Sequence, residues 1–448
     1  MRLEPLELLW FVEILSKQSG KQEERMTNGF VKLLAVGMLG TTSGVALAQP
    51  TLDLWHIQST GNGPSLIQQA VDRFVADNPD VTVNVVPMQN DPYKTRIRTS
   101  IGAGDAPCIF PSWGGGPLYQ YVQAGQVLDL SAYMNADGYV ERFVPAALSN
   151  VTFDGNIYGV PVENTAVAVV WYNERIFADL SLEPPATFGE LRNVVATLSE
   201  NGIAPFSLAN KTKWTSSMYY MYLVDRLAGP EPFASSANRT GGTFGAEPFV
   251  EAGRLVQELV EAGAFNEGFN GLDYDTGGSR MLLYGGRAAM ELMGSWELSS
   301  FKTENPDFYE NVGFFPFPAV EGGEGDPSSV VGTVGDNFYH VSSGCRFPDE
   351  AFELMTYLID DESVEVRIAD GRIPPVVGVA ERLEDPILQE LAAMIEDAGS
   401  VQLWYDQYLP PELGETHKDI MQALFGLEIT PEEAAQRQEE ATAAFYSR

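Results

Sequence analysis

The sequence has little of what catalytic and metal centres need. It contains three histidines and two cysteines in 448 residues, and each histidine stands apart from cysteine or carboxylate partners at metal-ligand spacing. The chain also lacks a G-x-S-x-G nucleophile elbow, a G-x-x-x-x-G-K-S/T phosphate loop and a G-x-G-x-x-G turn after a strand. Nucleophile-elbow hydrolysis and nucleotide binding therefore have no local support, and we expect neither a bound metal nor a cofactor.

One short stretch has a faint likeness to a calcium loop. Asp273-Tyr274-Asp275 is followed by Gly277 and Gly278, which supply carboxylates and a sharp turn. The stretch lacks a third ligand and the bidentate glutamate that closes such loops. We therefore expect no metal there.

Basic residues are scarce. The chain has 27 Lys and Arg against 62 Asp and Glu, a formal charge of -35, and residues 1–48 hold five of each sign, so the excess survives their removal. Such a negative field repels phosphate backbones and anionic lipid, which disfavours nucleic-acid binding and attachment to a membrane surface. A neutral ligand is not penalised. Solubility in a salty habitat explains the acidity better than any property of the ligand does.

The beginning of the chain predicts export. A signal peptide over residues 26–48 starts at Met26, takes its positive charge from Lys32, and has an apolar stretch too short and glycine-rich to span a membrane. It ends in Ala46-Leu47-Ala48, so we place the mature start at Gln49 and interpret residues 1–25 as a start called too early, the alternative being a true extension. No cysteine follows the apolar stretch, which predicts a periplasmic protein without a lipid anchor.

The two cysteines, Cys108 and Cys345, are far apart in the sequence. A single disulfide is compatible with an oxidising compartment. We expect instead two separate buried thiols, and a fold that does not depend on a disulfide framework.

The mature chain opens with a β-α-β pattern. An alternating run at 52–55 is followed by turn residues at 59–64, a helix with apolar residues on one face, and a second alternating strand at 81–85. This order predicts an α/β fold whose parallel sheet is covered by helices, with a ligand crevice beyond the carboxyl ends of the strands. Further helices are expected at 92–101, 117–124, 249–262, 350–359 and 431–445, and further strands at 108–110 and 288–293.

Tryptophans are the main candidates for a binding function, because a sugar site needs flat aromatic faces and polar groups for the hydroxyls. Trp55-His56 ends the first strand, and Trp113 precedes glycines 114–116, which would let a ligand approach the backbone. Glu163-Asn164 interrupts the apolar run 160–170, and a ligand hydroxyl is one partner that such a buried carboxylate could find. Trp171, inside that run, is expected in the core.

Several short motifs, taken in order, carry a family resemblance. They are Leu52-Asp53-Leu54-Trp55-His56, Gly104-Asp105-Ala106-Pro107, Tyr158-Gly159-Val160-Pro161-Val162-Glu163, Trp171-Tyr172-Asn173, Gly286-Arg287-Ala288-Ala289-Met290, Gly294-Ser295-Trp296, Phe315-Pro316-Phe317-Pro318 and Thr430-Pro431-Glu432-Glu433-Ala434. Over residues 50–448 the chain resembles the extracellular solute-binding proteins that include maltose-binding protein, particularly the raffinose and xylo-oligosaccharide binders. It departs from them at Cys108, where the family usually has an acidic residue.

The resemblance implies two α/β lobes joined by hinge strands, with a ligand cleft between them. Chain crossings would fall near Pro161, Val334 and Pro374. Lobe 1 would comprise 49–160 and 334–373, and lobe 2 would comprise 161–333 and 374–448. By position Glu163 matches an acidic residue that contacts sugar hydroxyls, Trp296 and Trp404 match stacking aromatics, and Trp113 lies in a contact loop. The predicted ligand-binding set is Trp55, His56, Trp113, Glu163, Asn164, Trp214, Tyr219, Trp296, Asp336, Asn337, Trp404 and Asp406.

The function implied is that of a monomeric periplasmic receptor. It would bind a neutral mono- or oligosaccharide, deliver it to the permease of an ABC importer, and perform no catalysis. One alternative is a secreted glycoside hydrolase, which requires two suitably spaced carboxylates, and an acidic chain offers many coincidental pairs. Another is a receptor for a polyamine or a phosphorylated compound, which the negative field and the number of tryptophans disfavour.

Overall fold

The computed structural model describes residues 49–448, and the predicted signal peptide lies outside them. Within this range the strands form a nine-stranded sheet whose main path runs β2-β1-β3-β10-β6-β8-β7, with β9 pairing with β6 and β11 with β10. The strands are β1 (Thr51–His56), β2 (Thr82–Pro87), β3 (Ile109–Ser112), β6 (Val160–Asn173), β7 (Ala204–Phe206), β8 (Ala288–Gly294), β9 (Val312–Phe315), β10 (Val330–Val341) and β11 (Val401–Gln402), with a separate hairpin of β4 (Thr152–Phe153) and β5 (Asn156–Ile157).

The helices follow the predicted ranges to within a few residues wherever the sequence predicted one. They are α1 (Gly63–Asp77), α2 (Asn90–Gly102), α3 (Gly115–Gln123), α4 (Ser131–Asn135), α5 (Pro145–Ser149), α6 (Glu174–Asp179), α7 (Phe188–Glu200), α8 (Trp214–Ala228), α9 (Glu231–Ala237), α10 (Glu247–Glu261), α11 (Gly278–Tyr284), α12 (Glu297–Glu304), α13 (Pro306–Tyr309), α14 (Pro348–Tyr357), α15 (Asp361–Ala369), α16 (Pro386–Glu396), α17 (Tyr405–Tyr408), α18 (Pro411–Phe425) and α19 (Pro431–Tyr446).

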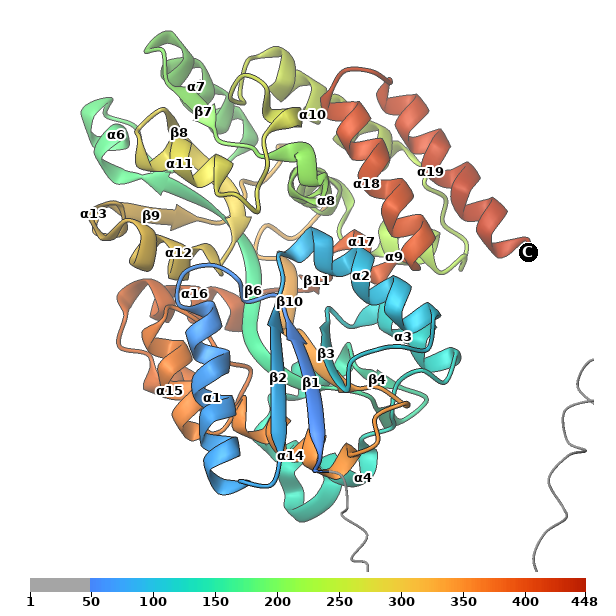
Figure 1. The fold of residues 1–448 in the computed structure, drawn as a ribbon. Helices are drawn as coiled ribbons and strands as arrows, with labels where there is room; N and C mark the ends of the chain where they lie inside the picture. The colour runs from blue at the N-terminus through green and yellow to red at the C-terminus, as the bar shows by residue number, and fades with distance from the viewer. Residues whose placement is uncertain (1–48) are drawn as a thin grey trace, which may run out of the picture. The chain divides into compact units, whose positions relative to one another are not determined.

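Two α/β lobes are built around the two ends of this sheet. In Figure 1, β1, β2 and β3 with α1, α4 and α14 form the lower half, and β7, β8 and β9 with α7, α10 and α11 form the upper half. The β1 strand pairs in parallel with both β2 and β3, and β7 pairs in parallel with β8. The predicted parallel β-α-β unit is thus confirmed. No helix among residues 49–448 has both the length and the apolar character to cross a membrane.

The two long strands, β6 and β10, connect the lobes. The first part of β6 pairs with β10, and its second part pairs with β8 and β9. The end of β10 pairs with β3, and the β10–β6 register shifts between Thr333, Asp336 and Phe338. A third segment meets them here, because the backbone N–H of Ile373 donates to Asn164 Oδ1 at 2.8 Å. The strand pairing and this bond place polar side chains where the lobes join.

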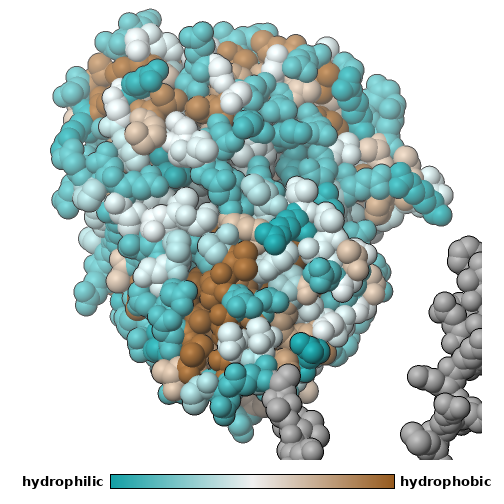
Figure 2. Space-filling view, in the orientation of Figure 1, coloured by the Kyte–Doolittle hydropathy of each residue, from teal (hydrophilic) through white to brown (hydrophobic). Residues whose placement is uncertain are grey.

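Burial explains why β6 is apolar along most of its length. Nearly every residue of the strand is buried, as expected for a central strand covered on both faces. Trp171 is fully buried and packs edge-on against Phe301 and Phe314, which confirms its place in the core. In contrast, β2 is an edge strand that alternates between exposed and half-buried residues, and Figure 2 shows apolar side chains over it on an otherwise largely hydrophilic face.

The prediction of two separate thiols is wrong. Cys108 and Cys345 form a disulfide with their Cα atoms 4.7 Å apart, closing a loop with a sequence separation of 237. Cys108 immediately precedes β3, Cys345 follows β10, and the antiparallel pairing of Val341 with Ile109 brings these strand ends together. The two cysteines are neighbours because β3 and β10 are adjacent in the sheet. Their separation along the sequence does not indicate this strand order.

Candidate functional site

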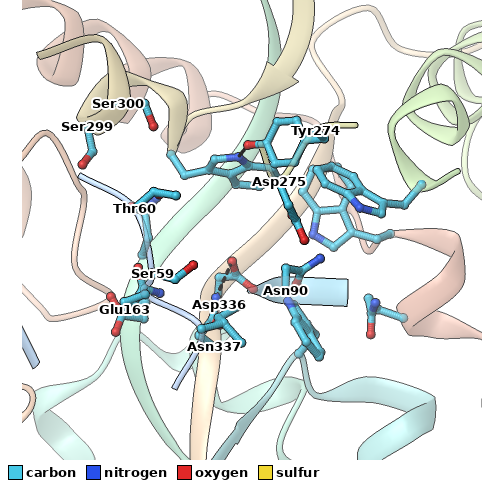
Figure 3. A pocket seen from close by; sticks show the side chains of 18 of the residues that line it. Ser59, Thr60, Asn90, Glu163, Tyr274, Asp275, Ser299, Ser300, Asp336 and Asn337 are labelled. Atoms are coloured by element: carbon cyan, nitrogen blue, oxygen red, sulfur yellow. Dashed lines mark hydrogen bonds between the residues drawn. The ribbon is translucent and has the colours of Figure 1, made fainter. Parts of the chain in front are cut away.

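A cavity of about 1210 Å³, a volume that includes open solvent at its mouth, lies where β6 and β10 pass between the lobes. Its walls come from segments that are far apart in the chain, including the residues after β1, the start of α2, the middle of β6 and β10, the loop before α11 and the segment around α17. Figure 3 shows polar side chains entering this space from both lobes. We refer to it below as the cleft cavity.

Four indoles line the cleft cavity: Trp113, Trp214, Trp296 and Trp404. Trp113 follows β3, whereas the others stand at or just before the first residue of α8, α12 and α17. The ring centroids of Trp214 and Trp296 are 6.2 Å apart, and those of Trp296 and Trp404 are 5.9 Å apart, with tilted planes. Trp214, Trp296 and Trp404 therefore form a continuous aromatic wall on one side of the cavity.

Opposite the aromatic wall lie polar groups that lack partners. Among the described residues Asp336 Oδ1, Asn337 Oδ1 and Asn164 Nδ2 are buried and have no hydrogen-bond partner, and on the aromatic wall itself Trp214 Nε1 is also unpartnered. Asn337 donates from Nδ2 to Asp336 Oδ2 at 2.9 Å, and Figure 3 shows both side chains in the middle of the site. Burial raises the pKa of Asp336 to about 7. Because unpaired buried polar atoms are costly, this set is suited to a guest that brings both donors and acceptors.

Glu163 lines the cavity but has protein partners. Its carboxylate accepts from Arg367 Nη2 at 3.3 Å and from Arg372 Nη1 at 2.9 Å, and all three side chains are buried. Arg372 is also bonded to Asp370 and Gln58. The sequence places this carboxylate in an apolar stretch without an evident partner. In the structure two guanidinium groups bind it and fix its orientation at the edge of the cavity.

Most of the predicted site residues come together here. Those that line the cavity are Trp113, Glu163, Asn164, Trp214, Trp296, Asp336, Asn337, Trp404 and Asp406. Trp55, His56 and Tyr219 do not line it. Instead, Ile57, Gln58, Ser59 and Thr60 line it, which places the cavity beyond the end of β1 but one residue later than predicted.

The three displaced residues have structural roles. Trp55 is nearly buried, and the guanidinium of Arg96 lies 4.3 Å from its ring centroid. His56 is buried beside it, and desolvation lowers its pKa to about 4. Tyr219 is fully buried in α8 and packs edge-on against Phe206 and other aromatic rings of the core. All three side chains are buried in the protein core and not exposed in the cavity.

The glycine run after Trp113 also has a different role from the one predicted. Gly114 and Gly115 adopt φ of 73° and 60°, a region that favours glycine. A Cβ at Gly114 would meet the Asn150 carbonyl oxygen at 2.6 Å, and one at Gly116 would meet the Leu409 carbonyl oxygen at 2.6 Å. The glycines therefore admit close approach of the protein's own backbone rather than of a ligand.

Several lining residues were missed by the sequence analysis, among them Asn90, Lys94, Tyr274, Asp275 and Arg280. Two of them, Tyr274 and Asp275, belong to the Asp273-Tyr274-Asp275 stretch, which the sequence suggests only as a weak metal loop. In the structure Asp275 Oδ2 accepts from the backbone N–H of Asp91 at 3.2 Å, so this loop contacts the start of α2. No group of three or more potential metal ligands occurs among residues 49–448.

The chain belongs to the family of bacterial extracellular solute-binding proteins, whose family model matches residues 58–365. A solved structure from a study of xylan utilization by the thermophilic bacterium Caldanaerobius polysaccharolyticus is similar to it with a TM-score of 0.81 and 30% identity, covering 87% of this chain and 99% of that one. Two curated relatives are an uncharacterized ABC transporter extracellular-binding protein of Pyrococcus horikoshii, 23% identical over 64% of this chain and 67% of its own, and a multiple sugar-binding protein of Streptococcus mutans, 22% identical over 72% and 74%. These two are described as binding proteins, not as enzymes.

Proposed function

We propose that this chain is the receptor of an ABC-type carbohydrate importer, and that it binds a neutral oligosaccharide in the cleft cavity. The observation that carries the proposal is the meeting of four tryptophans with unpartnered buried donors and acceptors in one cavity between the lobes. Indole faces suit the apolar side of a pyranose ring, and the polar atoms suit its hydroxyls. Sugar-related relatives and the extracellular family support the same function.

The charges that line the cavity favour an uncharged ligand. Arg280 is bonded to Glu304 and Glu297, and Arg372 is bonded to Glu163 and Asp370, so neither guanidinium is free to bind a phosphate. The acidic groups Asp275 and Asp336 have their pKa values raised chiefly by burial, which favours their neutral forms. Lys94 also lines the cavity, with its Nζ 4.7 Å from the Trp113 ring centroid, so a phosphorylated ligand would find this ammonium there but no free guanidinium group.

The proposed contacts are the lining residues named by the sequence: Trp113, Glu163, Asn164, Trp214, Trp296, Asp336, Asn337, Trp404 and Asp406. The lobe division at 49–160 with 334–373 and 161–333 with 374–448 remains part of the proposal. Ligand binding would favour the closed arrangement of these lobes, and that form would dock on the permease. The protein would act as a monomer in the periplasm, exported by the predicted signal peptide, without a lipid anchor and without catalysis.

The test is a titration of residues 49–448 with xylo-, malto- and raffinose-series sugars, followed by tryptophan fluorescence. We expect a saturable change with at least one series, because the aromatic wall includes several indoles. A protein that responds to no neutral saccharide would contradict the proposal. Chromatography of the bound sugar after long incubation addresses the glycoside hydrolase alternative, since a receptor leaves the oligosaccharide intact.

A further inference from the structure

The indole of Trp296 is held in the cleft cavity by a chain of hydrogen bonds that the sequence did not reveal. Its Nε1–H donates to the hydroxyl oxygen of Tyr274 at 2.7 Å, and the Tyr274 hydroxyl donates to Glu297 Oε1 at 2.5 Å. The direction of both bonds is fixed. An indole N–H can only donate, so the single proton of the tyrosine must go to the carboxylate.

The carboxylate of Glu297, at the far end of this series of hydrogen bonds, is also held in place. Glu297 is fully buried, and Arg280 Nη1 donates to the same Oε1 atom at 3.4 Å. Arg280 in turn makes two bonds to Glu304, at 3.0 and 3.1 Å, in a bidentate pair. Burial and the neighbouring Glu297 carboxylate raise the pKa of Tyr274 well above its ordinary value. The hydroxyl therefore keeps the proton that it donates to Glu297.

Packing against neighbouring groups restricts how the Trp296 ring can tilt. One side of the Trp296 ring lies against the backbone at Gly294, where any Cβ would overlap it. Trp214 and Trp404 flank it on the same wall with inclined ring planes. These contacts limit tilting but leave rotation about the side-chain torsions to be set by the bond to Tyr274. The ring of Tyr274 is buttressed by Trp214, with centroids 4.8 Å apart.

We propose that Tyr274 is a positioning residue for ligand recognition, acting through the Trp296 indole that it fixes in the plane required for stacking. This inference rests on the proposed function of the cleft cavity. Figure 3 shows Tyr274 at the roof of the cavity, on the same loop as Asp275, whose side chain points down toward the floor. Tyr274 of the faint calcium motif therefore supports the aromatic wall.

The test compares two tyrosine-to-phenylalanine variants in the same network. Tyr274→Phe removes the hydroxyl that joins Trp296 to Glu297, whereas Tyr284→Phe removes a hydroxyl that donates to Glu304 at 3.0 Å on the exposed side. With xylotriose as the probe in calorimetric titration, we expect Tyr274→Phe to weaken binding about tenfold, since the half-buried Trp296 indole loses the acceptor that orients it. Tyr284→Phe should change affinity by less than about twofold. Wild-type affinity in Tyr274→Phe would overturn the proposal.

A double-mutant cycle separates positioning from direct contact. Trp296→Phe keeps an aromatic ring but has no N–H to donate, so Tyr274→Phe should add little to its loss of affinity if the hydroxyl acts through the indole. An undiminished effect of Tyr274→Phe in the Trp296→Phe background would show that the tyrosine acts on the ligand directly, and would contradict positioning.

A measurement on the free protein keeps the inference independent of the choice of sugar. Trp296→Phe identifies the Trp296 indole N–H resonance in the spectrum of the wild type. We expect that proton to exchange slowly with solvent in the wild type and quickly in Tyr274→Phe, with the other indole protons unchanged. Fast exchange in the wild type would overturn the proposal. If no saccharide bound while Trp296 remained protected, the proposed function would fail and the positioning geometry would stand.

Discussion

Replacing Glu291 with glutamine should make the protein more stable at neutral and alkaline pH. Glu291 lies on β8 opposite Trp171, is fully buried, and has no hydrogen-bond partner for either carboxyl oxygen among the described residues. Burial, reinforced by the nearby Glu297 carboxylate, raises its pKa from 4.5 to about 8. The folded protein therefore retains a proton that the unfolded chain releases at neutral pH.

The sign and size of the effect follow from this difference. A carboxyl whose folded pKa is raised contributes stability that is fully present below its unfolded pKa and is lost as pH rises toward its folded pKa. Between pH 4.5 and pH 7 the loss amounts to about 3 kcal/mol, at 1.36 kcal/mol per pH unit. Glutamine resembles the protonated carboxyl in shape and charge, so Glu291→Gln avoids this loss.

Urea unfolding at pH 5 and pH 8 measures the effect. We expect the free energy of unfolding of Glu291→Gln relative to the wild type to increase by about 3 to 4 kcal/mol from pH 5 to pH 8. Glu261→Gln, at an exposed position on α10, is the control, and its difference from the wild type should not vary with pH. A pH-independent difference for Glu291→Gln would refute the assignment of a neutral buried carboxyl.

Further predictions concern the site and its framework. Gly294→Ala should displace the Trp296 ring and lower sugar affinity at least about tenfold, measured by calorimetry, because the new methyl group overlaps the indole; unchanged affinity would contradict the described packing. Reduction of the Cys108–Cys345 disulfide should lower the free energy of unfolding by about 2 to 5 kcal/mol in urea while leaving affinity intact, since the loop that it closes is long; equal stability of the oxidised and reduced forms would argue against the bond. Glu163→Ala should cost about 3 to 5 kcal/mol of stability, because it removes the carboxylate that two buried guanidinium groups share, and a loss below 1 kcal/mol would contradict the importance of these buried ion pairs.

The fold was largely predictable because its periodicities are local. The alternating strands near the mature start and the one-sided helix between them appear in the structure as β1, α1 and β2. Central strand β6 was recognisable as an apolar run interrupted by Glu163 and Asn164, with Trp171 expected in the core. The disulfide was not predictable, since it depends on β3 and β10 becoming neighbours through a long crossover.

The site was predictable only in part, because residue type and position do not determine the direction of a side chain. Trp113, Trp296 and Trp404 reach the cavity, whereas Trp55 at the end of β1 turns inward. Glu163 was identified as a buried carboxylate, but its arginine partners lie about two hundred residues away. Tyr274 escaped notice because its role depends on the Trp296 indole nitrogen and not on any sequence pattern.

The most direct measurement of the central claim is calorimetric titration of the wild type and of Trp296→Ala with neutral oligosaccharides. The account predicts one binding site in the wild type and at least about thirtyfold weaker binding in the variant, because a buried aromatic contact is lost. The absence of binding by the wild type, or equal affinity in the two proteins, would contradict the claim that the indoles of the cleft cavity hold a glycan.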